Sequence, residues 1–554
     1  MKTKTFIVSL CLLALCLSAC AAPVASPTQP PVGAEAPAAA APAVIAQSDE
    51  KSDSSQQSHI GVAPMLPAAT IAAPSYDRNL PEASAPDSGL AQPAAPALND
   101  TTFAENDPNP KTQTNYDHLS TFALDVDTAS YTVVRKYLEQ GLQPDPDAVR
   151  PEEFVNYFDQ GYRSPDHAAF ALYADGAPSP LSSHGKTYLV RFGVKGYDIP
   201  DSERKPLTLT FIIDISGSMN MDNRLGLVKR TLQVLVDRLN GEDSVAIVVF
   251  GSTARLHLPV TSGGDKNRIL NAIYSLETEG STNAGDGMRL GYETAMSAFR
   301  PSSSNRVIFC SDGVANTGLT NPDQILDMVG GYVSEGVYLT TLGFGLDNFN
   351  DYLLERLADK GNGNYAYIDT IDEARSLFID QLTSTLDVIA KDAKIQVDFN
   401  SDVVASYRQI GYENRQLDDS DFRNDRVDAG ELGPGHSVAA LYEVTLHKGA
   451  EGRLATLQMR WKDPKTEKVS EINGNLNTWD LKNRFEDTDT RYQLAVTAAK
   501  FAEVLSNSPY AEGIHYYQLQ ALAESLTYKL GDDPDVVEFV RLVDRAASLS
   551  NENW

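Results

Sequence analysis

The hydrophobic pattern in the middle of the chain alternates between two periods. Residues 207–213 form a nearly continuous apolar segment, which is typical of a strand buried on both faces of a parallel sheet. Residues 224–239 carry apolar side chains at helical spacing, and short apolar segments recur at 244–250, 306–310 and 336–344. Strands that alternate with helices predict an α/β fold with a doubly wound, mainly parallel sheet. Ligands of such sheets bind at the carboxyl ends of the strands.

The flanks of this region show the period-two alternation of half-buried strands. Such strands are predicted at residues 169–174, 186–194, 394–399, 403–407, 437–446 and 453–461. We interpret the strands before and after the α/β region as one β-sandwich-like region into which the α/β domain is inserted. Helical spacing returns toward the end of the chain and predicts a helical C-terminal segment over residues 492–505, 516–526 and 534–547.

The region before the α/β domain also has clear local signals. Residues 120–127 alternate as a strand does, and Thr128 is expected to cap a helix that continues to residue 138. Pro151 stands where the first position of a second short helix is expected, and proline is well tolerated there.

The start of the chain has the pattern of a bacterial export signal. Lys2 and Lys4 precede an apolar segment over residues 6–19, which is too short to span a bilayer core of ~30 Å. This segment ends in Leu-Ser-Ala-Cys, which resembles a lipobox and implies cleavage before Cys20 and lipidation of its thiol. The alternative is an ordinary secretory signal with a cysteine at its end by chance. The Ala-, Pro- and Ser-rich residues 20–113 are expected to form a disordered tether.

Composition narrows the classes of function. The net charge is −29, which disfavours binding to nucleic acid or to anionic lipid, because both require a basic face. Of the four cysteines, two lie in the predicted signal and Cys20 would be lipidated, so Cys310 alone belongs to the folded region and no disulfide is expected. The lipid is the only membrane attachment that the sequence predicts.

Side chains with hard oxygen ligands collect at the predicted strand ends. Asp214, Ser216 and Ser218 follow the first apolar strand in a D-x-S-x-S pattern, Thr282 lies in a later loop, and Asp312 follows the strand at 306–310. The set contains neither Cys nor His, so it suits Mg²⁺ or Mn²⁺ and argues against zinc or copper.

These motifs resemble the complete metal-ion-dependent adhesion site of von Willebrand factor type A (VWA) domains. The resemblance implies that the Ser and Thr hydroxyls bind the ion directly and that Asp214 and Asp312 bind it directly or through water. It also implies that an Asp or Glu carboxylate of a protein partner completes the coordination.

The segments on both sides resemble those of a group of bacterial VWA lipoproteins. The similarity includes S-T-F-A-L-D-V-D-T-A-S-Y at residues 120–131, P-E-E-F-V-N-Y-F at 151–158 and I-G-Y-E-N-R at 410–415. The predicted organisation is a signal peptide, the tether, a VWA-associated N-terminal region, the VWA domain and a C-terminal β-rich then helical domain, at residues 1–19, 20–113, 114–200, 201–390 and 391–554.

Three functions are consistent with these features. The first is a cell-envelope lipoprotein that binds a protein partner through Mg²⁺, anchored in the outer membrane or on the outer face of the cytoplasmic membrane. The second is a structural or assembly protein with a vestigial metal site. The third is a metal-dependent hydrolase, which the absence of a His or a paired Glu in the quoted loops disfavours. We therefore predict a binding protein and not an enzyme.

Two other features are interpreted as structural. The acidic residues 418–421 and Asp425 lack the Gly and Glu positions of an EF-hand and are expected to form a solvated loop. His436 is expected to form a structural hydrogen bond.

Overall fold

The computed structural model describes residue 103 and residues 107–124, 127–181, 187–200, 202–313, 322–345, 350–380, 382–427 and 429–550. The predicted signal peptide, Cys20 and most of the predicted tether lie outside these residues. Within the described ranges, no helix combines the length and the apolar composition needed to cross a membrane.

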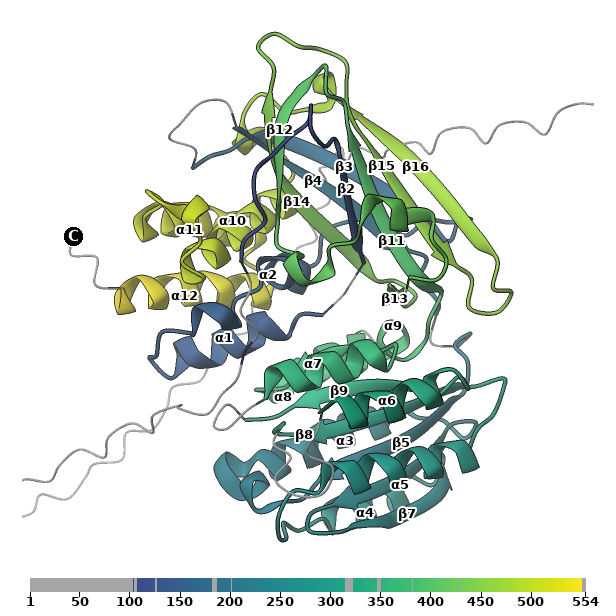
Figure 1. The fold of residues 1–554 in the computed structure, drawn as a ribbon. Coiled ribbons are helices and arrows are strands. Elements are labelled where there is room, and N and C mark those ends of the chain that lie inside the picture. Colours follow the sequence, from purple (N-terminus) through teal and green to yellow (C-terminus); the bar gives the residue numbers. More distant parts are fainter. Residues whose placement is uncertain are drawn as a thin grey trace, which may run out of the picture. The chain divides into compact units, whose positions relative to one another are not determined.

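The α/β region forms one sheet (Figure 1). Its strand order is β10-β9-β8-β5-β6-β7. Its strands are β5 (Leu207–Asp214), β6 (Ser244–Phe250), β7 (Ala254–Ser262), β8 (Ser304–Ser311), β9 (Tyr338–Gly343) and β10 (Tyr365–Tyr367). The pairs β5–β6, β5–β8, β8–β9 and β9–β10 are parallel, and among the described strands of this sheet only the hairpin pair β6–β7 is antiparallel. The predicted doubly wound, mainly parallel sheet is confirmed.

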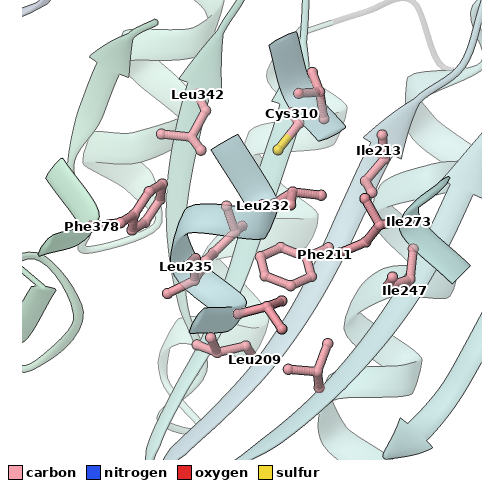
Figure 2. Packing of buried hydrophobic residues seen from close by; sticks show 14 of the residues in the cluster. Leu209, Phe211, Ile213, Leu232, Leu235, Ile247, Ile273, Cys310, Leu342 and Phe378 are labelled. Carbon is pink, nitrogen blue, oxygen red and sulfur yellow. The ribbon is translucent and has the colours of Figure 1, made fainter. Parts of the chain in front are cut away.

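Helices cover both faces of this sheet, which explains the continuous apolar character of β5. Phe211 and Ile213 pack with the first set of helices, whereas Ile212 between them packs with the second set. The first set is α3 (Arg224–Arg238), α4 (Lys266–Tyr274) and α8 (Ile371–Arg375). The second set is α5 (Ala284–Ser297), α6 (Pro322–Val333) and α7 (Asp351–Lys360). Figure 2 shows Phe211, Leu232 and Ile273 converging in the first of these two cores.

The flanking strands form two sheets that pack on each other. One has the order β1-β12-β14-β4-β3, from strands Thr112–Gln113, Val404–Ile410, Ser437–Leu446, Thr187–Gly196 and Phe170–Pro178. The other has the order β13-β11-β15-β16, with β2 also paired to β11, from strands Gly430–Leu432, Ala390–Phe399, Arg453–Lys462, Val469–Asn477 and Leu119–Ala123.

A shared core joins these two sheets into a sandwich. Phe192 of β4 and Phe399 of β11 belong to one buried cluster, and their ring centroids are 6.4 Å apart. Strands from before and after the α/β region therefore form one β-sandwich, which confirms the interpretation of the α/β domain as an insertion. Thr112 and Gln113, which their composition assigned to the tether, form the edge strand β1.

Helices from the two ends of the folded region pack together. The C-terminal helices α10 (Thr490–Leu505), α11 (Tyr516–Leu530) and α12 (Pro534–Leu549) share a buried cluster with α1 (Ala129–Glu139) and α2 (Pro151–Tyr157). Pro151 occupies a first-turn position of α2, as predicted. Thr128 occupies the N-cap position of α1, as predicted, but its side chain makes no capping hydrogen bond. Contacts of Tyr131 and Val134 with the C-terminal helices hold α1 in place instead.

Candidate functional site

The site begins where β5 and β8 end side by side. Their parallel register pairs Ile213 with Cys310, so Asp214 lies next to Ser311. Asp214 is fully buried and accepts two hydrogen bonds, one at Oδ1 from the Ser216 N–H at 2.8 Å and one at Oδ2 from the Ser311 hydroxyl at 2.8 Å. These bonds fix the orientation of its carboxylate at the carboxyl edge of the sheet.

The D-x-S-x-S turn brings its two serines together. Ser216 immediately precedes a short 3₁₀ helix over Gly217–Asn223, and its Oγ lies 3.0 Å from the Oγ of Ser218. Ser216 is buried and Ser218 is half-buried, so the pair extends from the interior toward the surface. Two adjacent hydroxyls beside a buried carboxylate form a cluster of hard oxygen atoms.

The loop that carries Thr282 is hydrogen-bonded to this turn. The Glu279 N–H donates to the Ile215 carbonyl at 2.6 Å, and the Gly217 N–H donates to the Gly280 carbonyl at 3.1 Å. Gly280 has a φ of +68°, and a Cβ there would lie 2.1 Å from the Ser252 Oγ, so the close approach requires glycine. Thr282 itself is buried. The structure therefore brings the Thr282 loop to the D-x-S-x-S turn, as the sequence predicted.

Asp312 follows β8 and has two different carboxylate oxygens. Oδ2 accepts a hydrogen bond from Arg224 Nη1 at 2.9 Å, whereas Oδ1 is buried and has no hydrogen-bond partner among the described residues. A buried carboxylate oxygen without a partner is costly and calls for an explanation such as a cation. Asp312 is thus oriented with one oxygen paired to an arginine and the other open to a ligand.

Arg224 is a residue of this site that sequence reasoning missed. It is the first residue of α3 and lies one helical turn before Val228, on the buried side of the helix. A charged residue in line with an apolar stripe was the available signal, because a buried arginine requires an anionic partner. Its partner lies 88 positions away, so the sequence did not identify it.

The electrostatics of the site favour a cation. Burial, together with the nearby charge of Asp312, raises the pKa of Asp214 to about 7. A divalent ion would stabilise the charged form of both carboxylates and lower this pKa. The side chains present are carboxylates and hydroxyls, which fit Mg²⁺ or Mn²⁺. Burial raises the pKa of the neighbouring Cys310 thiol, so it stays protonated and does not act as a thiolate ligand.

The two features interpreted as structural have protein partners. His436 Nδ1 accepts a hydrogen bond from the Gly433 N–H at 3.1 Å, which confirms its structural role. In the acidic loop, Asp419 accepts from the Thr121 hydroxyl at 2.6 Å and Asp425 pairs with Arg460 at 2.7 Å. The carboxylate of Asp421 accepts from the Asn424 side chain at 2.8 Å, so Asp419, Asp421 and Asp425 are engaged by protein groups.

Comparison with known families agrees with this architecture. Residues 208–381 match the von Willebrand factor type A domain family, and residues 97–191 match a family described as von Willebrand factor. The fold is that of a VWA-domain protein. Residues 384–549 match the C-terminal domain of the uncharacterized protein YfbK.

Similarity to whole proteins is more specific. The chain is 37% identical over 478 residues to the uncharacterized protein YfbK of Escherichia coli (strain K12), an alignment that covers 81% of each chain. The protein therefore belongs to the YfbK family. Human inter-alpha-trypsin inhibitor heavy chain H3 is 30% identical over 166 residues, which cover 28% of this chain and 18% of that one. A solved von Willebrand factor type A structure from Catenulispora acidiphila aligns with a TM-score of 0.39 at 16% identity, over 69% of this chain and 91% of that one.

Proposed function

We propose that this protein captures a protein partner through a divalent cation, Mg²⁺ or Mn²⁺. The proposed ligands are the side chains of Asp214, Ser216, Ser218, Thr282 and Asp312, and an Asp or Glu of the partner completes the coordination. The observation that carries the proposal is the buried Oδ1 of Asp312, which has no hydrogen-bond partner among the described residues and belongs to the same strand edge as a second buried carboxylate. A bound cation supplies the local positive charge that a chain of net charge −29 needs to attract a carboxylate.

We further propose that the partner is met at the cell envelope. Lipidation of Cys20 anchors the chain, and the Ala- and Pro-rich tether carries the VWA domain away from the membrane. A tether of this length has an r.m.s. reach on the order of 50 Å, which lets one anchored protein search a wide area for its partner.

The site supports binding better than hydrolysis. A metal-dependent hydrolase requires a general base within hydrogen-bond reach of the attacking water. Segments 214–219, 279–283 and 311–313, which form the site, contain no histidine. Glu279, the one glutamate in these segments, is paired with Arg255. We therefore propose that the protein is not an enzyme.

One observation favours a second candidate, a structural or assembly protein whose site works without metal. The Arg224–Asp312 ion pair is buried, with the two side chains 2% and 1% exposed, and it neutralises one of the two buried carboxylates. This pair lets the loops keep their arrangement without a cation. The two candidates differ in whether a cation binds and whether partner capture requires it.

Calorimetric titration of Mg²⁺ and Mn²⁺ separates the candidates. The protein starts at residue 20, carries Cys20→Ser to prevent acylation, and is treated with a chelator first. We expect one ion per chain in the parent protein. We expect Asp214→Asn and Thr282→Ala to abolish ion binding although both variants stay folded, with melting temperatures above the temperature of the titration. Asp372→Asn is the matched control, because the Asp372 side chain is 84% exposed. Absence of binding in the parent protein, together with metal-independent partner capture, would establish the structural candidate.

A further inference from the structure

Arg224 gives the site a third buried charge. Its guanidinium donates from Nη1 to Asp312 Oδ2 at 2.9 Å, and only 2% of the side chain is exposed. The side chain also lies against the backbone at the end of β9, because a Cβ at Gly345 would lie 2.0 Å from Arg224 Nε. Gly345 has a φ of +83°, so glycine serves both the turn and the space that the guanidinium occupies.

The buried charges of the site can be counted. With both carboxylates ionised, Asp214 and Asp312 contribute two negative charges and Arg224 contributes one positive charge, so these three described side chains carry a net charge of −1. The nearby exposed carboxylates of Glu279 and Asp286 are paired with Arg255 and Arg289 and face solvent, where charges are screened. Adding a divalent ion to these three side chains gives a net charge of +1. One carboxylate from a bound ligand then brings the net charge to zero. Without Arg224, the loaded site would carry one positive charge fewer.

We propose that Arg224 sets the ligand preference of the site: its buried positive charge adds to that of the bound ion, which weakens cation binding but strengthens binding of a carboxylate. The inference rests on the proposed metal-dependent function and adds the residue that makes the loaded site selective for an anion. Arg224 does this without touching the ligand, because its side chain is almost completely buried. It acts through the electric field, which is strong where burial keeps the effective dielectric low.

This role differs from that of an arginine that only holds Asp312 in place. Loss of a residue that merely orients a ligand group weakens binding of the metal and of everything bound to the metal. Loss of a charge of the same sign as the cation has the opposite effect on the cation, because like charges repel. The two roles therefore predict opposite changes in metal affinity when the charge is removed.

The test uses Mn²⁺ as the metal and acetate as the carboxylate probe. Water-proton relaxation measures Mn²⁺ binding, and it also measures the loss of metal-bound water when acetate coordinates. The proteins are the parent, Arg224→Gln and Arg224→Lys, all starting at residue 20 with Cys20→Ser. Gln removes the charge and keeps an N–H donor for Asp312, whereas Lys keeps the charge and removes the guanidinium.

We expect Arg224→Gln to bind Mn²⁺ about tenfold more tightly and the Mn²⁺-loaded protein to bind acetate about tenfold more weakly. We expect Arg224→Lys to keep both affinities within about threefold of the parent. Weakening of both affinities in Arg224→Gln, or no change in either, would overturn the inference. If Arg224→Gln does not fold, a folded Arg224→Lys that has lost acetate binding would also overturn it, and one that retains both affinities would support it. Absence of Mn²⁺ binding in the parent would instead overturn the proposed function and, with it, this inference.

Discussion

At the scale of single residues, the site combines predicted and unpredicted groups. The D-x-S-x-S pattern and Asp312 could be recognised from sequence, because strand ends of a parallel sheet converge at one edge. The ion pair between Arg224 and Asp312 could not, because it depends on how α3 packs against β8. The same holds at Thr128, whose side chain makes no capping hydrogen bond: α1 is held by packing against the C-terminal helices, which the local sequence does not reveal.

The raised pKa of Asp214 predicts how metal-free stability depends on pH. Its pKa is about 7 in the folded protein against an ordinary value of 3.8, so the folded state binds the proton more tightly than the unfolded state does. Stability of the metal-free protein therefore falls as the pH rises from about 4 to 7, by up to about 1.4 kcal/mol per pH unit. Asp214→Asn removes this contribution.

Melting temperatures in chelator at pH 5, 6, 7 and 8 measure the effect. The parent is expected to lose stability more steeply than Asp214→Asn over the lower part of this range, and the two curves should run parallel above pH 7. Glu153 and Glu373, whose pKa values burial also raises to about 7, are present in both proteins and cancel in the difference. Parallel stability curves for the parent and Asp214→Asn across the whole pH range would contradict the raised pKa of Asp214.

At the scale of elements, most helices and strands could be predicted from the spacing of apolar residues along the chain. The central strands β5, β6 and β8 of the α/β sheet are buried throughout because helices cover both faces, and their apolar runs are easy to detect. Strand β16 was missed because it is an edge strand with many exposed polar positions, such as Glu471 and Asn473. Sheet order and register depend on contacts between distant segments, so the sequence pattern did not supply them.

The close packing of α5 on β5 predicts opposite effects for two Gly→Ala substitutions in helices. A Cβ at Gly291 in α5 would lie 2.1 Å from Ile212 Cδ1 and 2.4 Å from its Cγ1, and Ile212 is fully buried. Gly291→Ala should therefore lower the stability by about 1–3 kcal/mol through overpacking. Gly331→Ala in α6 is the matched control, since a Cβ there meets nothing within 4 Å.

The control should raise the stability by about 0.5–1 kcal/mol, because alanine favours the helix relative to glycine. Melting temperatures of the two variants, measured beside the parent protein, test the pair. A Gly291→Ala protein as stable as Gly331→Ala would show that Ile212 moves away freely and that α5 does not pack as tightly as described.

At the scale of the whole molecule, buried ion pairs connect segments that are distant in sequence. Arg135 of α1 contacts Asp369 and Glu373 of the α/β domain, at 2.5 and 2.9 Å, and Glu538 of α12 at 3.0 Å. The β-sandwich could be inferred from sequence because strands with the same period flank the α/β domain. The network around Arg135 could not be inferred, because its members come from three separate segments.

Removal of Arg135 should therefore destabilise the folded region strongly. Arg135→Met leaves Asp369 and Glu373 buried without their cation, and loss of one partner of a buried pair typically costs about 3–5 kcal/mol. Scanning calorimetry should show a melting temperature several degrees below that of the parent. Arg375→Met is the control, because its pair with Asp372 is exposed and should contribute less than about 1 kcal/mol. Equal melting temperatures for the two variants would argue against a stabilising network.

The most direct measurement of the central claim is a crystal structure of the protein with Mn²⁺, with the ion located by its anomalous scattering. We expect one peak at the carboxyl ends of β5 and β8, at about 2.1–2.2 Å from the Oγ of Ser216 and the Oγ of Ser218. Asp312 Oδ1 should face the ion, directly or through one water, while Oδ2 keeps its bond to Arg224. The absence of a peak at millimolar Mn²⁺, or a peak only at another acidic surface, would contradict this claim.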